Sequence, residues 1–218
     1  MLENLIISTA AYDGYSLDES LEAIAELGVT NVELAFIKGY TEPFTEGYFN
    51  KENAHMTINL LEKYGLRCTS FSSHMDLSSP GIVEIFRKRM SFAKAVGSST
   101  IITNAAPTTN ADIFYENMKA LAGYAEEIDL FIGLENPGDG VQNVLHQGTN
   151  GQEVIDRIGS ANVGVNYDFG NLLSHCFEKV RPETDYLECK DQTVHYHVKD
   201  VVQDDDGWVF TPIGDGSI

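Results

Sequence analysis

The sequence predicts an α/β fold and, within that class, a (β/α)8 barrel, also called a TIM barrel. Short runs rich in β-forming residues alternate with longer helical patterns, which indicates parallel strands joined by right-handed crossovers. The strand runs are apolar almost throughout, as is typical of a sheet buried on both faces. No Gly-x-Gly-x-x-Gly or Walker-type loop follows any strand, which disfavours a doubly wound open sheet. Polar residues instead end several strands, as they do at the mouth of a barrel.

The first half of the chain contains four strand and helix pairs. Strands are predicted over residues 5–9, 31–36, 67–72 and 100–104, and helices over residues 17–27, 51–64, 82–96 and 111–128. Three of these helices are followed directly by a glycine (Gly28, Gly65 and Gly97), whose tolerance of left-handed backbone makes it a common helix stop.

The second half of the chain continues the alternation with strands over residues 130–135, 162–168 and 193–199. Apolar runs at 201–203 and 208–210 flank a polar tip and predict a hairpin, and the glycines at 214 and 216 resemble the cap of a further helix. A closed barrel of this type has an eighth strand. We therefore expect residues 1–218 to form one TIM-barrel domain whose last strand and helix lie outside this sequence.

The composition narrows the class of partner. The chain has 14 Lys and Arg against 33 Asp and Glu, a formal net charge of −19. So acidic a surface disfavours binding to nucleic acid and to anionic membranes and leaves a small neutral or singly anionic substrate.

No apolar run reaches transmembrane length. The cysteines, Cys68, Cys176 and Cys189, lack paired spacing, so we expect reduced thiols in a cytoplasmic protein. The sequence leaves open whether the protein forms a homo-oligomer.

Three strand ends carry residues that bind metal ions in other proteins. Glu135 closes the run 130–134, Asp168 closes 163–167, and His197 follows 194–196. Each alone has an ordinary structural explanation, but burying two carboxylates beside apolar strands is costly unless a cation receives them. Together the three predict a divalent-metal site. Oxygen-rich ligands with one imidazole favour Mn²⁺ or Mg²⁺, with Co²⁺ and Zn²⁺ left open.

The local sequences around these residues carry a family resemblance: Leu134-Glu135-Asn136, Asp168-Phe169-Gly170-Asn171 and His197-Val198-Lys199-Asp200. Over residues 5–216 the chain resembles the xylose-isomerase-like superfamily of TIM barrels, which includes sugar phosphate isomerases and epimerases and the type IV apurinic endonucleases. The resemblance implies that Glu135, Asp168 and His197 bind the metal. In that superfamily a further Glu on strand eight normally completes the site. His195 is a rival for the histidine ligand and ranks second.

Other strand ends supply candidate substrate contacts. The resemblance implies that His74 and Glu33 touch substrate hydroxyls, although Glu33 is equally well explained as a polar residue bonded within the mouth. Asn104 and Asn171 lie where they can line the mouth. Lys199 is expected either to neutralise a substrate oxyanion or to pair with its neighbour Asp200.

The leading hypothesis is a metal-dependent isomerase or epimerase of a monosaccharide or sugar-like ketone. Glu135 would act as metal ligand and as catalytic acid/base in proton transfer through an enediolate. One alternative is the metal-dependent endonuclease branch of the superfamily, but this chain has Asn104, Asn171 and Phe210 where that branch has histidines. A second alternative is a non-catalytic sugar-binding barrel. The residue at the end of strand eight would separate this alternative from an enzyme.

Overall fold

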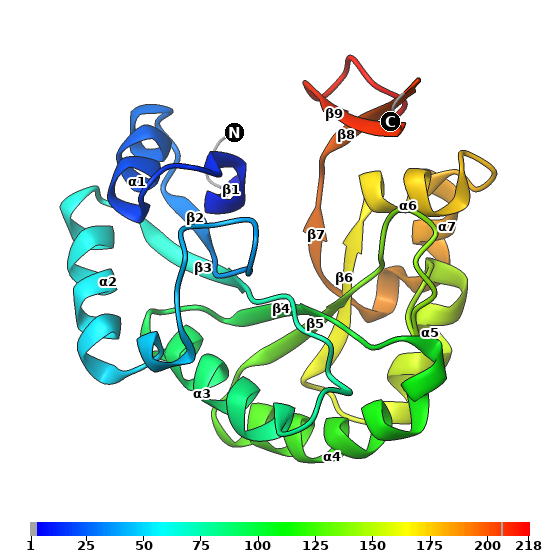
Figure 1. Cartoon of the computed structure of the whole chain (residues 1–218), viewed down its shortest axis with the longest axis horizontal. Helices are drawn as coiled ribbons and strands as arrows, with labels where there is room; N and C mark the ends of the chain where they lie inside the picture. The colour runs from blue at the N-terminus through cyan, green and yellow to red at the C-terminus, as the bar shows by residue number, and fades with distance from the viewer. Residues whose placement is uncertain (1–3, 206) are drawn as a thin grey trace.

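The computed structural model describes residues 4–205 and 207–218. Seven parallel strands follow one another in chain order around a curved sheet (Figure 1). They are β1 (Ile6–Ser8), β2 (Asn31–Ala35), β3 (Arg67–Ser72), β4 (Thr100–Asn104), β5 (Phe131–Glu135), β6 (Val163–Asp168) and β7 (Thr193–His197). All seven predicted strands are confirmed. Within the described ranges, no eighth parallel strand follows β7.

The helices lie on the convex side of this sheet (Figure 1). They are α1 (Leu17–Glu26), α2 (Lys51–Lys63), α3 (Ile82–Ala95), α4 (Ala111–Glu127), α5 (Gly148–Ile158), α6 (Phe169–Cys176) and α7 (Pro182–Cys189). Single 3-10 turns occupy η1 (Thr9–Tyr12), η2 (Glu46–Tyr48), η3 (Thr108–Asn110) and η4 (Lys190–Gln192). The four predicted helices are confirmed to within one residue. No helix of the described residues has both the length and the apolar composition that a membrane span needs.

The hairpin predicted after the seventh strand is confirmed, and the helix cap predicted at Gly214 and Gly216 stays a prediction. Strands β8 (Asp200–Asp204) and β9 (Gly207–Thr211) pair antiparallel. Residues 212–218 then turn back toward Asp200, whose Oδ2 accepts hydrogen bonds from the backbone N–H groups of Gly214 (2.9 Å) and Gly216 (3.0 Å). A Cβ on Gly216 would lie 2.2 Å from Asp200 Oδ1, so glycine is needed there. Asp200 therefore anchors a turn.

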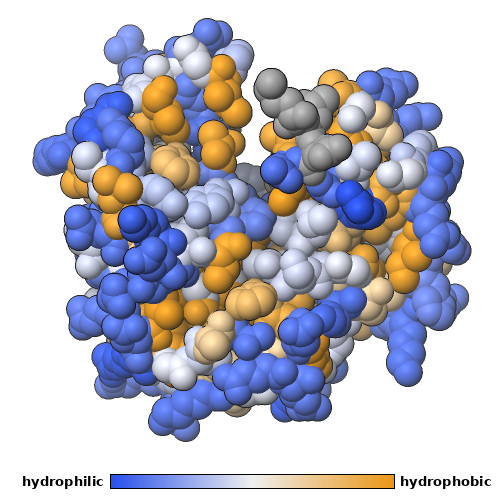
Figure 2. Space-filling view, turned by 180° about the vertical axis from the view of Figure 1, so that it is seen from behind, coloured by the Kyte–Doolittle hydropathy of each residue, from blue (hydrophilic) through white to orange (hydrophobic). Residues whose placement is uncertain are grey.

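The core lies between the sheet and the helices, and one buried cation crosses it. Arg89 of α3 is only 1% exposed. Its guanidinium donates to both carboxylate oxygens of Glu46 (2.6 and 3.0 Å) and to Ser73 Oγ (2.8 Å), and it lies over the rings of Phe44 and Phe49. A buried charge is tolerated when it is paired in this way. The pair ties the segment between β2 and α2 to α3. On the outer surface, hydrophilic side chains cover much of the face in Figure 2, with hydrophobic ones exposed between them.

Two register shifts in the sheet bear directly on the site. Between β2 and β3, Val32 pairs with Cys68 but Glu33 pairs with Ser70. Between β6 and β7, Val165 pairs with Thr193 but Asn166 pairs with His195. One residue is therefore extra in β3 and another in β7, as in a β-bulge, which re-aims neighbouring side chains and is common beside active sites. The two shifts bring Glu33 opposite Ser70 and Asn166 opposite His195.

Candidate metal and active site

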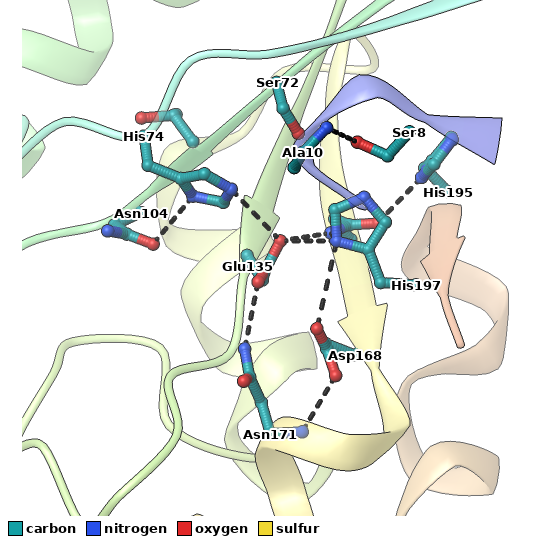
Figure 3. A network of polar contacts seen from close by, with 12 residues as sticks. Ser8, Ala10, Ser72, His74, Asn104, Glu135, Asp168, Asn171, His195 and His197 are labelled. Carbon is teal, nitrogen blue, oxygen red and sulfur yellow. Dashed lines mark hydrogen bonds and ion pairs between the residues drawn. The ribbon is translucent and has the colours of Figure 1, made fainter. Parts of the chain in front are cut away.

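The structure brings Glu135, Asp168 and His197 together at the carboxyl ends of β5, β6 and β7 (Figure 3). Nδ1 of His197 lies 2.9 Å from Glu135 Oε2 and 3.9 Å from Asp168 Oδ2. One donor atom from each residue lies within 4.8 Å of the others. Glu135 is 5% exposed and Asp168 is 1% exposed. These side chains form a compact set of two buried carboxylates and one partly buried imidazole.

This donor set fits a divalent cation. The oxygen of Glu135 and Nδ1 of His197 approach to 2.9 Å although both are acceptors unless a proton lies between them. The side-chain nitrogen of Asn166, which can only donate, lies 3.1 Å from the same Nδ1. In the neutral ring Nδ1 carries a lone pair on the side of the carboxylate, and a cation bound by both atoms would remove the repulsion between them. Oxygen donors with one imidazole suit Mg²⁺, Mn²⁺ or a related ion.

Three asparagines hold the two carboxylates in place. Asn171 donates through its side chain to Glu135 Oε1 (2.9 Å) and through its backbone N–H to Asp168 Oδ1 (2.8 Å). Asn136 hydrogen-bonds both the N–H and the C=O of Asp168. Asn166 donates to Glu135 Oε2 at 2.6 Å. Asn166 was not among the predicted site residues. Its signal was its place two residues before Asp168, because alternate residues of a strand point to the same side.

Lys199, one of the predicted substrate contacts, pairs with Asp168 rather than with Asp200. Its Nζ lies 2.9 Å from Asp168 Oδ2 and donates to Asn171 Oδ1 at 2.6 Å. A Cβ on Gly170 would lie 2.6 Å from Lys199 Cγ, so the absence of a side chain there lets the lysine pass. The prediction of a Lys199–Asp200 pair is wrong, because the backbone amides of the C-terminal turn occupy the Asp200 carboxylate.

His74 and Asn104 lie beside Glu135 on the other flank (Figure 3). Nδ1 of His74 lies 3.1 Å from the side-chain oxygen of Asn104, and Nε2 lies 3.7 Å from Glu135 Oε2. Since an amide oxygen only accepts, Nδ1 of His74 carries the proton. In the neutral ring, Nε2 then presents a lone pair. The His74 side chain is 15% exposed, so this nitrogen lies at the edge of the buried set.

Glu33 lies behind His197 and is only 2% exposed. Its two oxygens accept hydrogen bonds from Ser72 Oγ (2.8 Å) and Ser70 Oγ (3.0 Å). They also lie 3.2 and 3.1 Å from Nε2 of His197. Nε2 of His195 is 3.8 Å from Glu33, so Glu33, His195 and His197 form a second group with close donor atoms. Glu33 is thus surrounded by side chains of β3 and β7.

Burial and charge act against each other in this cluster. Burial alone would raise the pKa of Glu135, but His197 and His74 outweigh it and lower that pKa to about 2. Burial would lower the pKa of His197, yet the flanking Glu33 and Glu135 hold it well above its ordinary range. For Asp168 burial prevails over the attraction of Lys199, and its pKa is raised. When His197 is neutral, as it must be to bind a metal ion, the ionised carboxylates of Glu33, Glu135 and Asp168 exceed the charge of Lys199 by two, which a divalent cation would balance.

The fold and this site define an α/β barrel-type protein with a carboxylate and histidine cluster at its strand ends. The chain belongs to the xylose isomerase-like TIM barrel family, whose model matches residues 21–218. No curated protein matches the chain.

Solved structures of the same fold include sugar epimerases and a dehydratase. One is the probable 3-DHS dehydratase AsbF from Bacillus anthracis, at 14% identity and TM-score 0.76, covering 100% of this chain and 85% of that one. Another is a xylose isomerase-like TIM barrel protein from Mycobacterium smegmatis in complex with magnesium (14%, 0.77, 98% and 82%). A third is a D-allulose 3-epimerase from Methylomonas sp. in complex with D-allulose (18%, 0.71, 98% and 75%). At such identities the likeness shows the shared fold.

Proposed function

We propose that the chain is a metal-dependent isomerase or epimerase of a monosaccharide or a sugar-like ketone. The observation that carries the proposal is the convergence of Glu135, Asp168 and His197, with His74 beside Glu135. Solved structures of the same fold support the substrate class, because they include 3-epimerases of D-psicose, L-ribulose and D-allulose.

Glu135, Asp168 and His197 would hold the ion, and Mn²⁺ or Mg²⁺ is the proposed metal, with Co²⁺ or Zn²⁺ as alternatives. When bound, the ion would polarise the substrate carbonyl and stabilise the negative charge that develops on its oxygen during proton transfer. The magnesium in the Mycobacterium smegmatis structure supports this choice. A reducing, cytoplasmic setting belongs to the proposal, because all three cysteines are free and two of them are buried.

The proposed role of each side chain follows from its position in the site. Glu135, ionised at neutral pH, is the base proposed to take a proton from the carbon beside the substrate carbonyl. His74, whose protonated Nδ1 is fixed by Asn104, offers Nε2 to a substrate hydroxyl. Asn171 and Lys199 are proposed to touch substrate oxygens, and the lysine also keeps Asp168 oriented.

The endonuclease-like alternative receives less support from these contacts. Asn104 and Asn171 serve His74 and Glu135 as hydrogen-bond partners and offer no imidazole to further zinc ions. A non-catalytic sugar-binding barrel would keep the same cluster without turnover. A measurement of activity must therefore decide between this alternative and an isomerase or epimerase.

The test is ion binding followed by a search for isomer formation. Chelator-treated protein would be titrated calorimetrically with Mn²⁺ and Mg²⁺ and then incubated with a panel of ketoses whose products are separated chromatographically. We expect one tightly bound ion per chain and conversion of at least one ketose that stops with EDTA. Glu84→Gln, an exposed carboxylate of α3 that pairs with Lys88, is the control and should behave as wild type. Sugar binding without conversion would favour the non-catalytic barrel.

A further inference from the structure

We infer that Glu33 is a positioning residue that sets the orientation and the proton position of the His197 ring for metal binding. The inference rests on the proposed function, since it concerns a ligand of the same site. It departs from the expectation that Glu33 touches substrate, because Glu33 is 2% exposed and enclosed by serine and histidine side chains.

The two nitrogens of His197 face different partners. Nδ1 faces Glu135 and Asp168, while Nε2 lies 3.2 and 3.1 Å from the two oxygens of Glu33. A carboxylate only accepts, so Nε2 carries the proton that it shares with Glu33. In the neutral ring the lone pair is therefore on Nδ1, the nitrogen on the side of Glu135 and Asp168. Metal-binding histidines commonly donate their second ring N–H to a carboxylate in this manner, which fixes the tautomer and raises ligand basicity.

Glu33 is itself held rigidly, as this role requires. The hydroxyls of Ser70 and Ser72 donate to its two oxygens at 3.0 and 2.8 Å. The register shift between β2 and β3 matters here, since it pairs Glu33 with Ser70 instead of Thr69. These donors stabilise the ionised form of the buried carboxylate. The serines thus fix the Glu33 side chain of β2 in the position where it contacts His197 of β7, 164 residues further along the chain.

His195 closes the remaining side of Glu33. The orientation of Asn166 is fixed because its side-chain nitrogen must face the Glu135 carboxylate, 2.6 Å away. Its oxygen then accepts from Nδ1 of His195 at 2.9 Å. His195 is thus part of the support around Glu33 and Asn166. Figure 3 shows Glu135 and Asp168 on one side of the His197 ring and His195 on the other.

Glu33, His195 and His197 also meet the distance condition for a second cation. The charge balance favours the positioning role instead. One divalent ion already offsets the excess of carboxylates over Lys199, and a second ion would leave the buried cluster with two uncompensated positive charges. A second ion would also have to displace the proton that Nε2 shares with Glu33.

The test compares wild type, Glu33→Gln and Glu46→Gln, the last being a matched loss of a carboxylate that serves Arg89 outside the site. Calorimetry with Mg²⁺ and Mn²⁺ should give one ion per wild-type chain and about 10- to 100-fold weaker binding for Glu33→Gln. Glu46→Gln should lower the melting temperature and leave the affinity unchanged. In metal-free protein, NMR should show a downfield, slowly exchanging Nε2 proton of His197 in wild type that moves upfield in Glu33→Gln.

The outcomes separate the two proposals. Equal metal affinity and an unchanged Nε2 proton in Glu33→Gln, or two ions per wild-type chain, would overturn the positioning role and leave the proposed function standing. Absence of metal binding by wild type would contradict the proposed function, while the Nε2 proton would still decide whether Glu33 holds the ring. If Glu33→Gln does not fold, Ser72→Ala removes one donor to Glu33 and should weaken metal binding several-fold; wild-type affinity in that variant would overturn the inference.

Discussion

Nζ of Lys199 lies 2.9 Å from Oδ2 of Asp168, and the two form an ion pair inside the proposed metal site. Asp168 is 1% exposed and the Lys199 side chain is 32% exposed, so the lysine enters from the edge of the site. The carboxylate thus has a permanent cationic partner besides the ion that it would bind.

Lys199→Met should make stability depend more strongly on metal. Without the ammonium, the buried Asp168 keeps its negative charge unpaired unless an ion is present. We expect the metal-free variant to melt several degrees below wild type, at roughly 2–4 °C for each kcal/mol lost, and saturating Mg²⁺ to restore most of the difference. Thermal unfolding with Mg²⁺ and with EDTA measures this. Lys88→Met, an exposed lysine of α3, is the control. Equal destabilisation with and without Mg²⁺ would show that Lys199 acts through packing.

Glu135→Gln should separate sugar binding from chemistry. The amide keeps the size of the side chain, and its single oxygen can still accept a hydrogen bond from either Asn171 or Asn166, but not from both. It cannot take a proton. We expect kcat to fall by about 10²- to 10⁴-fold with a much smaller change in KM. Steady-state kinetics at saturating metal, with occupancy checked by metal analysis, test this. A variant that holds its metal and retains near-wild-type kcat would assign Glu135 to metal binding alone.

The Glu46–Arg89 pair should contribute to acid sensitivity. Hydrogen bonds from Arg89, working against burial, hold the pKa of Glu46 below its ordinary value. A depressed folded-state pKa gives stability that is complete above the unfolded value of about 4.3 and is lost as the pH falls through the folded value. Glu46→Gln should lower the urea midpoint at pH 7 and flatten its decline below about pH 4.3. Parallel curves for the two proteins across this range would contradict the assignment.

Gly164→Ala should disturb the site through the sheet. A Cβ there would lie 2.5 Å from Val194 Cγ1 and 2.6 Å from the backbone oxygen of Gln192, where β7 has its extra residue. We expect a loss of about 1–3 kcal/mol from overpacking and weaker metal binding as the strand carrying His197 shifts. Gly123→Ala is the matched control, since it has open space in α4 and should stabilise by about 0.5–1 kcal/mol. Unchanged metal affinity in Gly164→Ala would show that the register shift does not govern the site.

The strand pattern was predictable from sequence because buried parallel strands read as short apolar runs between glycines and helices. Helices α5, α6 and α7 were not predicted. The first turn of α5 is glycine-rich and its N-terminal N–H groups are capped by Asp185, which is 37 residues further along the chain. Helix α6 begins immediately after Asp168, the last residue of β6, so no loop marks its start. Both starts depend on residues whose second role appears only in three dimensions.

The candidate site, too, was only partly predictable from the sequence. Strand-end position was enough to single out Glu135, Asp168 and His197, because parallel strands deliver their ends to one rim. The partner of Lys199 was not predictable, since Asp200 is its neighbour in sequence but turns toward the backbone amides of the C-terminal turn. The surroundings of Glu33 depend on two register shifts that leave no periodic trace in the sequence.

Metal-dependent proton transfer by Glu135 can be followed directly by NMR as deuterium uptake from solvent into ketoses incubated with the protein in D₂O. We predict exchange at one carbon beside the carbonyl of the true substrate, with Mn²⁺ or Mg²⁺ present, and loss of that exchange with EDTA or in Glu135→Gln. Exchange that persists at the wild-type rate without metal or without the Glu135 carboxylate would contradict metal-dependent proton transfer by Glu135. The same holds for a metal-loaded wild-type protein that turns over its substrate with no exchange and no change at any carbon beside a carbonyl.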